Sequence, residues 1–149
     1  MSKKAGSEGN RVATAIKSNK SPFYTADVDL EDDPSDVDKA AESVRRTLGK
    51  LPAGFMLISA GVKNLIVVVN IPAEKVATIS AKTWLIASLE GISTTISDES
   101  TDTLAKAVIE IDTPFKLKDI VRSNAFAYLR KCGQLEEESE DEEFFGLDD

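Results

Sequence analysis

The sequence predicts one α+β domain in which helices pack on a mainly antiparallel sheet, in the order helix, two strands, helix, two strands, helix. Apolar residues recur at helical spacing in three segments, and each of these segments follows a Pro and ends at a Gly. Runs of β-branched residues lie between them. A chain of 149 residues, 42% of them hydrophobic, is long enough for a single core. We therefore place one domain at residues 35–133.

The first helix is predicted over residues 35–48. It follows Pro34, Ser35 is a residue type that caps helices, and Gly49 ends it. Four apolar residues at helical spacing form one face that we expect to pack on the sheet: Val37, Ala41, Val44 and Leu48.

Residues 55–59 and 65–71 are predicted to form an antiparallel hairpin whose loop contains Gly61. In the second strand both alternating sets of side chains are apolar: Leu65, Val67 and Val69 in one, Ile66 and Val68 in the other. Water should therefore be excluded from both faces of this strand, and something must cover each side.

The second helix is predicted over residues 73–90, after Pro72 and before Gly91. Trp84, Leu85 and Leu89 lie away from its main apolar stripe, so the helix should be buried on more than one side. We interpret it either as a central helix between layers or as a subunit interface built on these three residues, which would make the protein a homo-oligomer.

A second hairpin is predicted from residues 92–97 and 104–111, although a short helix over 103–111 is an alternative for its second strand. The last helix begins with Thr113 as cap and Pro114 in its first turn, and Gly133 ends it. Its predicted core face consists of Leu117, Ile120, Val121, Ala125, Tyr128, Leu129 and Cys132.

Charge divides the chain into blocks. Residues 1–20 have a net charge of +4, residues 21–38 of −7, residues 39–134 of +4 and residues 135–149 of −9, within an overall charge of −8. Because blocks of like charge repel and stay solvated, we predict a flexible arm over residues 1–34, basic and then acidic, and an acidic tail over residues 134–149.

Several chemistries are missing from the sequence. It has no His and a single Cys, Cys132, and no Gly-rich phosphate loop or nucleophile turn is present. We therefore predict no enzyme activity, no metal site and no cofactor. The lone Cys, the polar amino terminus and the lack of an 18-residue apolar run predict an intracellular protein, in the cytoplasm or the nucleus, with no membrane span.

The bases of the middle segment concentrate on the first and last helices. They are Arg45, Arg46 and Lys50 on or just after the first, and Lys116, Lys118, Arg122, Arg130 and Lys131 on the last. If both basic faces lie on one side of the fold, they form a groove that follows nucleic-acid phosphates, to which the basic arm would add contacts. If they point apart, they are ordinary solvated surface.

The acidic tail also carries apolar residues, in the run Phe144-Phe145-Gly146-Leu147. Because a solubilising tail has no use for adjacent aromatics, Phe144, Phe145 and Leu147 are predicted to anchor in a pocket of a protein partner. A basic body joined to such a tail resembles the general plan of bacterial and phage single-stranded-DNA-binding proteins. That resemblance implies a tail that occupies the basic face when nucleic acid is absent and recruits partners when it is present.

The same tail looks like the acidic, Phe- and Leu-ended tails of eukaryotic ribosomal stalk proteins, but that resemblance stops at the tail, so no family is assigned. Our leading hypothesis is a non-enzymatic, oligomeric protein that binds nucleic acid, with single-stranded DNA or RNA favoured. The alternative is a dimeric protein-interaction adaptor whose acidic, Phe-containing tail docks into a partner.

Overall fold

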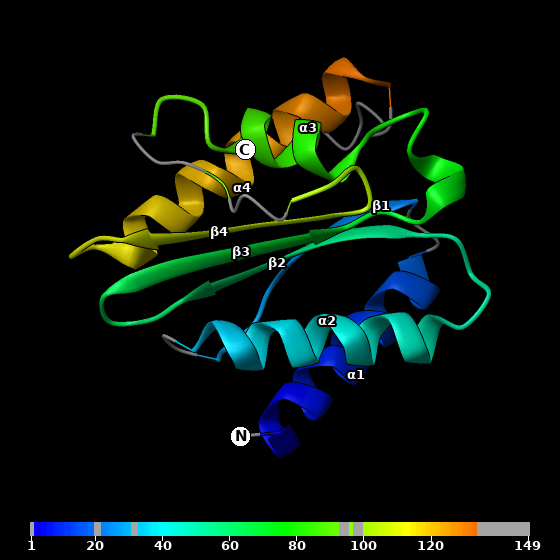
Figure 1. The fold of residues 1–149 in the computed structure, drawn as a ribbon, viewed down its shortest axis with the longest axis horizontal. Helices are drawn as coiled ribbons and strands as arrows, with labels where there is room; N and C mark the ends of the chain where they lie inside the picture. Colours follow the sequence, from blue (N-terminus) through cyan, green and yellow to red (C-terminus); the bar gives the residue numbers. More distant parts are fainter. Residues whose placement is uncertain (1, 20–21, 31–32, 93–95, 97–99, 134–149) are drawn as a thin grey trace, which may run out of the picture.

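The computed structural model describes residues 2–19, 22–30, 33–92, 96 and 100–133, and it has a mixed four-stranded sheet between two layers of helices (Figure 1). The strands are β1 (Phe23–Asp27), β2 (Gly54–Ala60), β3 (Asn64–Asn70) and β4 (Leu104–Glu110), and they lie side by side in that order. β1 runs parallel to β2, and the other neighbours are antiparallel. The α+β class is confirmed, and the sheet is mixed rather than purely antiparallel.

Two helices cover each face of the sheet (Figure 1). The helices α1 (Ser2–Asn19) and α2 (Pro34–Leu48) lie on one face, and α3 (Ala81–Ser88) and α4 (Pro114–Lys131) lie on the other. A short 3-10 turn, η1 (Ala73–Lys75), precedes α3. No helix within the described ranges has both the length and the apolar character that crossing a bilayer requires.

The predicted hairpin is the centre of this sandwich. β2 and β3 pair with Met56 opposite Val69 and Leu57 opposite Val68, and both faces are buried as expected. Phe55, Leu57, Ile66 and Val68 pack towards α1 and α2, whereas Met56, Ile58, Val67 and Val69 pack towards α3 and α4. The hairpin thus separates two hydrophobic cores, one on each face.

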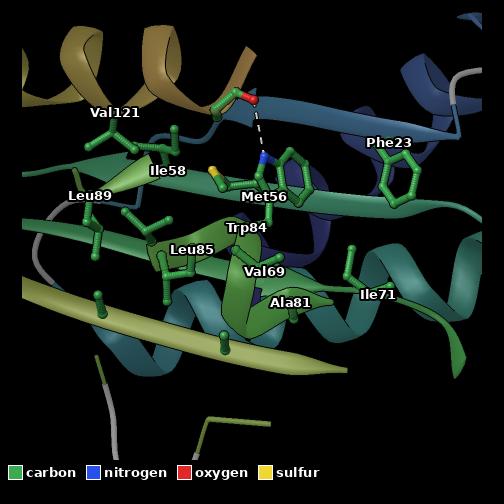
Figure 2. Packing of buried hydrophobic residues seen from close by; sticks show 14 of the residues in the cluster. Phe23, Met56, Ile58, Val69, Ile71, Ala81, Trp84, Leu85, Leu89 and Val121 are labelled. Carbon is green, nitrogen blue, oxygen red and sulfur yellow. Dashed lines mark hydrogen bonds between the residues drawn. The ribbon is translucent and has the colours of Figure 1, made fainter. Parts of the chain in front are cut away.

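The α3/α4 core is organised around Trp84, which is fully buried (Figure 2). Its ring meets Phe23 edge to face, with centroids 6.0 Å apart, a geometry that aromatic pairs favour. Its Nε1 donates to the carbonyl oxygen of Ala125 at 3.3 Å, which satisfies the indole in an apolar site. Trp84 therefore ties α3 to α4 and to β1.

The predicted helix over 73–90 is wrong in its extent, because the chain forms η1 and then α3. Ser80 is extended at φ −87° and ψ 153°, and its hydroxyl accepts from the N–H of Thr83 at 3.1 Å. A Ser that caps the following turn stops the preceding residues from continuing into the helix.

The alternative interpretation of this segment, a subunit interface built on three residues of and just after α3, is also wrong. Trp84 and Leu85 are 0% exposed and Leu89 is 6% exposed within the single chain. Their off-stripe positions reflect contacts with both the sheet and α4, so these side chains belong to the protein's own core and offer no surface to a second copy.

The expectation of a flexible arm over residues 1–34 is also corrected, since α1 and β1 lie within it. α1 buries a stripe at helical spacing, formed by Ala5, Gly9, Val12, Ala13 and Ile16, against α2 and the sheet. Three of its members are small, and the charges around the stripe dominated the composition of the segment. The burial of this stripe keeps the basic helix folded despite its like charges.

β4 and α4 are confirmed at residues 104–110 and 114–131, with the exception that Ile120, predicted to be in the core, is 49% exposed. The predicted partner strand over 92–97 is not part of the described sheet, whose fourth strand is β1. Ile92 and Ile96 are outside strands and pack partly buried on the α3/α4 core, while residues 93–95 and 97 lie outside the described residues.

The contact between α1 and α2 allows a paired test of this fold. A Cβ placed on Gly9 would lie 2.5 Å from Ser43 Cβ and 2.6 Å from the Ala40 carbonyl oxygen, whereas a Cβ on Gly6 meets nothing within 4 Å. We predict that Gly9→Ala lowers the free energy of unfolding by about 1–3 kcal/mol through overpacking. The control Gly6→Ala should raise it by about 0.5–1 kcal/mol, because Ala favours a helix over Gly.

Urea unfolding of both variants measures these two changes. If Gly9→Ala were as stable as Gly6→Ala, α1 would not pack on α2 as described.

Candidate nucleic-acid interface

A group of charged residues joins the two helical layers where β1 ends. We call it the Asp27 cluster, and it consists of Lys4, Glu8 and Arg11 from α1, Asp27 and Asp29 from the end of β1 and the residues after it, and Lys118 and Arg122 from α4. α1 lies on one face of the sheet and α4 on the other (Figure 1). Because β1 is an edge strand, both helices can reach its end.

The α1 side of the cluster holds the chain that follows β1. Arg11 Nη2 donates to Glu8 Oε1 and to the carbonyl oxygen of Asp27, both at 2.7 Å. Glu8 Oε1 also accepts from the backbone N–H of Asp29 at 3.2 Å, and Lys4 Nζ lies 3.3 Å from Asp29 Oδ2. These contacts bind α1 to backbone groups that the end of a strand would otherwise leave unpaired.

The same contacts change the titration of Glu8 and Arg11. Burial works to raise the pKa of Glu8, but the hydrogen bonds from Arg11 and from the Asp29 N–H, with the charge of Arg11, hold this pKa below its ordinary 4.5. The hydrogen bond to Glu8 raises the pKa of Arg11 in turn, against the opposing effect of burial. The pair is therefore ionised near neutral pH.

On the α4 side, one carboxylate oxygen receives two bases. Asp27 Oδ2 lies 3.4 Å from Lys118 Nζ and 3.5 Å from Arg122 Nη1. Lys118 and Arg122 are four residues apart, so they share one flank of α4 and both face β1. This flank lies beside the core stripe formed by Leu117, Val121 and Ala125. Lys118 and Arg122 thus anchor α4 to β1 as well as adding positive charge.

An aromatic side chain stands exposed beside these bases. Phe115 is 63% exposed, and Lys118 Nζ lies 5.1 Å from the centroid of its ring. Phe115, Lys118 and Arg11 line a common hollow of about 400 Å³, together with Glu8, Asp27, Val28, Asp29 and Ala60. Bases from α1 and α4 and an accessible aromatic therefore meet at one surface.

Sequence reasoning placed Lys116, Lys118 and Arg122 on this helix, but it expected most aromatics of the domain to be buried. The signal for Phe115 was present, since position 115 falls outside the stripe formed by 117, 121, 125 and 129. Arg11 and Lys4 were assigned to a flexible arm, so their contacts with Asp27 and Asp29, on the side of β1 opposite the α4 bases, were missed.

The basic residues of the two predicted helices do not share a surface. Arg45 and Arg46 are exposed in the last turn of α2 and Lys50 follows it, whereas all the α4 bases lie across the sheet from them (Figure 1). Arg130 and Lys131 are exposed in the last turn of α4, away from Phe115 in its first turn. Lys118 of α4 instead lines a hollow with Arg11 of α1. The predicted partner-binding residues Phe144, Phe145 and Leu147 lie outside the described residues.

The chain thus folds as a small α+β sandwich, and at one edge of its sheet lies a surface that carries charged side chains and the exposed Phe115. No protein-family model matches the sequence, and no curated protein matches it significantly. Among solved structures, the fold is similar to the C-Ala domain of alanyl-tRNA synthetase from Aquifex aeolicus. The TM-score is 0.52 and the identity 13%, over 74% of this chain and 88% of that domain. A likeness at this identity shows the shared fold alone.

The titration of Glu8 predicts how acid affects stability. Because the folded-state pKa of Glu8 lies below 4.5, its ionised form contributes stability above that pH, and this contribution disappears as the pH falls through the folded-state value. We predict that Glu8→Gln lowers stability at pH 7 and makes the loss of stability on acidification shallower than in the unsubstituted protein.

Thermal unfolding between pH 7 and pH 3 measures the effect. Glu74→Gln, which removes an exposed carboxylate in η1 away from the Asp27 cluster, serves as the control. Identical acid profiles for the unsubstituted protein and Glu8→Gln would contradict the role of this pair.

Proposed function

We propose that this protein binds nucleic acid without catalysis, and that single-stranded DNA or RNA is its ligand. The observation that carries the proposal is the exposed Phe115 between bases of two helices, with Lys118 over its ring and Arg11 across the hollow. Proteins that hold single strands combine an aromatic platform, on which bases stack, with cations that contact the backbone. Single strands suit this surface because their bases are free to stack.

Most cations of this surface already have carboxylate partners within the protein. Glu8, Asp27 and Asp29 already pair with Arg11, Lys118, Arg122 and Lys4, so phosphates must share these cations with carboxylates. Lys116 is exposed in the first turn of α4, and no ion pair among the described residues involves it. We therefore propose that Lys116 makes a leading phosphate contact, and that stacking on Phe115 supplies much of the affinity.

The structural similarity supports the same class of ligand. The C-Ala domain belongs to an enzyme whose name states that it acts on tRNA, and this chain shares that domain's fold. The acidic tail has a regulatory part in the proposal: its carboxylates compete with nucleic acid for the bases of α1 and α4, and Phe144, Phe145 and Leu147 engage a protein partner.

The interface is tested by titrating a labelled single-stranded oligonucleotide with the full chain at several salt concentrations. Phe115→Ala should weaken binding by about 1–3 kcal/mol, the value of one stacked base. Lys116→Ala should reduce the slope of log affinity against log salt by about 1. The double variant Arg45→Ala/Arg46→Ala removes two exposed bases from the opposite layer and is the matched control, with no expected change.

Binding that is undetectable up to about 1 mM at low salt would reject the proposed function. A loss of affinity in the α2 double variant, with none for Phe115→Ala and Lys116→Ala, would reject this interface and move the site to the α2 face.

The role of the tail is tested with a chain that ends at Gly133. Removing nine carboxylates that compete for the same cations should tighten oligonucleotide binding, most strongly at low salt. A double variant, Phe144→Ala/Phe145→Ala, retains the charge and should bind the oligonucleotide like the full chain. Equal affinities for the full and shortened chains would rule out competition by the tail.

A further inference from the structure

β4 has an outer edge that no other described strand covers. It pairs with β3 along one edge only, as the last strand of the sheet. The Leu104 carbonyl oxygen accepts from the Thr101 N–H at 2.7 Å, and the Lys106 N–H donates to Ser100 Oγ at 3.1 Å, so the backbone groups of these residues face away from β3. Because this orientation alternates along a strand, the backbone groups of Val108 and Glu110 face outwards as well.

Two apolar side chains of β4 are exposed to solvent near this edge. Leu104 is 44% exposed and Val108 is 43% exposed, on the sheet face that carries α1 and α2. Leu104 borders a hollow of about 370 Å³ between α2 and β4, whose lining includes Ala41 and Val68. The helices of this layer cover β2 and β3 but leave the face of β4 open.

The other face of the sheet has a matching exposed residue. Ile86 of α3 is 55% exposed. It follows Trp84 by two residues and so points about 200° round the helix from it. Trp84 contacts α4, so Ile86 points away from α4, on a helix that packs on β3 and β4. The helix that packs on β4 in this layer therefore also carries an exposed apolar side chain.

The order of charges along β4 indicates which strand could pair with its outer edge. Lys106, Val108 and Glu110 share one face of the strand and have outward-facing backbone groups. We propose that β4 pairs antiparallel with β4 of a second copy of the chain, about a two-fold axis at Val108. In this register Lys106 lies opposite Glu110 of the partner subunit, and Glu110 lies opposite the partner's Lys106, so both pairs are of opposite charge.

Two of the other symmetric registers bring like charges together, and those centred on Ala107 or Ile109 do not place Lys106 opposite Glu110 of the partner subunit. An axis at Lys106 places two ammonium groups opposite each other, and an axis at Glu110 does the same with two carboxylates. With the axis at Val108, the two copies of Val108 exchange both backbone hydrogen bonds, and each Lys106 carbonyl accepts from the partner's Glu110 N–H. Ser100 Oγ occupies the position at the Lys106 N–H that the carbonyl of the partner's Glu110 would take, so on association this N–H exchanges Ser100 for that carbonyl, and the pairing ends there.

Lys106 also pairs within its own chain. Its ammonium lies 2.9 Å from Asp38 Oδ2 of α2. A flexible ammonium has three donors, so it can serve Asp38 and the partner's Glu110 together. Because the alternation of side chains along the strand sets the face on which Lys106 lies, the pair with Asp38 is compatible with association but is not required for it.

The self-pairing is tested on the full chain by sedimentation equilibrium, without nucleic acid. A dimer is expected. Lys106→Glu and Glu110→Lys should each raise the dissociation constant on the order of tenfold, because two opposed pairs become like charges. The double variant Lys106→Glu/Glu110→Lys should restore it. An equimolar mixture of the two single variants should form a mixed dimer, since both cross-strand pairs are then of opposite charge.

Asp38→Asn is the control, because it removes the intrachain partner of Lys106 and leaves the strand pairing unchanged. Circular dichroism verifies that every variant is folded. A chain that stays monomeric up to about 1 mM overturns the proposal. So does a dimer that both single variants form as readily as the unsubstituted protein, or one that the double variant and the mixture fail to restore. None of these outcomes depends on whether the protein binds nucleic acid.

Discussion

The structure depends on a hairpin that is apolar on both faces. β2 and β3 bury nearly every side chain, so each face must be covered by helices before the hairpin is stable in water. α1 and α2 form one cover, and α3 and α4 form the other. Two packed layers on a four-stranded sheet follow from this requirement, and so does the separation of α2 from α4.

That separation places the two proposed binding surfaces at the edges of the sheet. Helices on opposite faces can approach each other only past an edge strand, and this occurs at the end of β1, where Asp27 meets Lys118 and Arg122 from one layer and Arg11 from the other. The same cluster of charges that joins the layers brings bases and Phe115 together. At the opposite edge, no described strand pairs with the outer side of β4, and the order of charges along β4 is complementary to that of a second, antiparallel β4.

Local patterns predicted most of the fold. The hairpin, α2, β4 and α4 follow from periodicity and from Pro and Gly at the boundaries, because these signals act over a few residues. α1 and β1 were missed because their apolar residues are small or sparse among charges, and charge was given more weight than spacing. The break before α3 was missed because the Ser80 cap and a continuous helix have similar local preferences.

The sequence by itself determined the class of fold, the central hairpin and the inventory of bases, since each depends on residue type and spacing along the chain. Only the tertiary structure decided which bases meet. Lys118 lines the same hollow as Arg11 and lies across the sheet from the α2 bases, because the end of β1 is reached by two helices from opposite layers. Phe115 is exposed, and Trp84, Leu85 and Leu89 are buried, for the same reason: burial depends on what packs against a side chain.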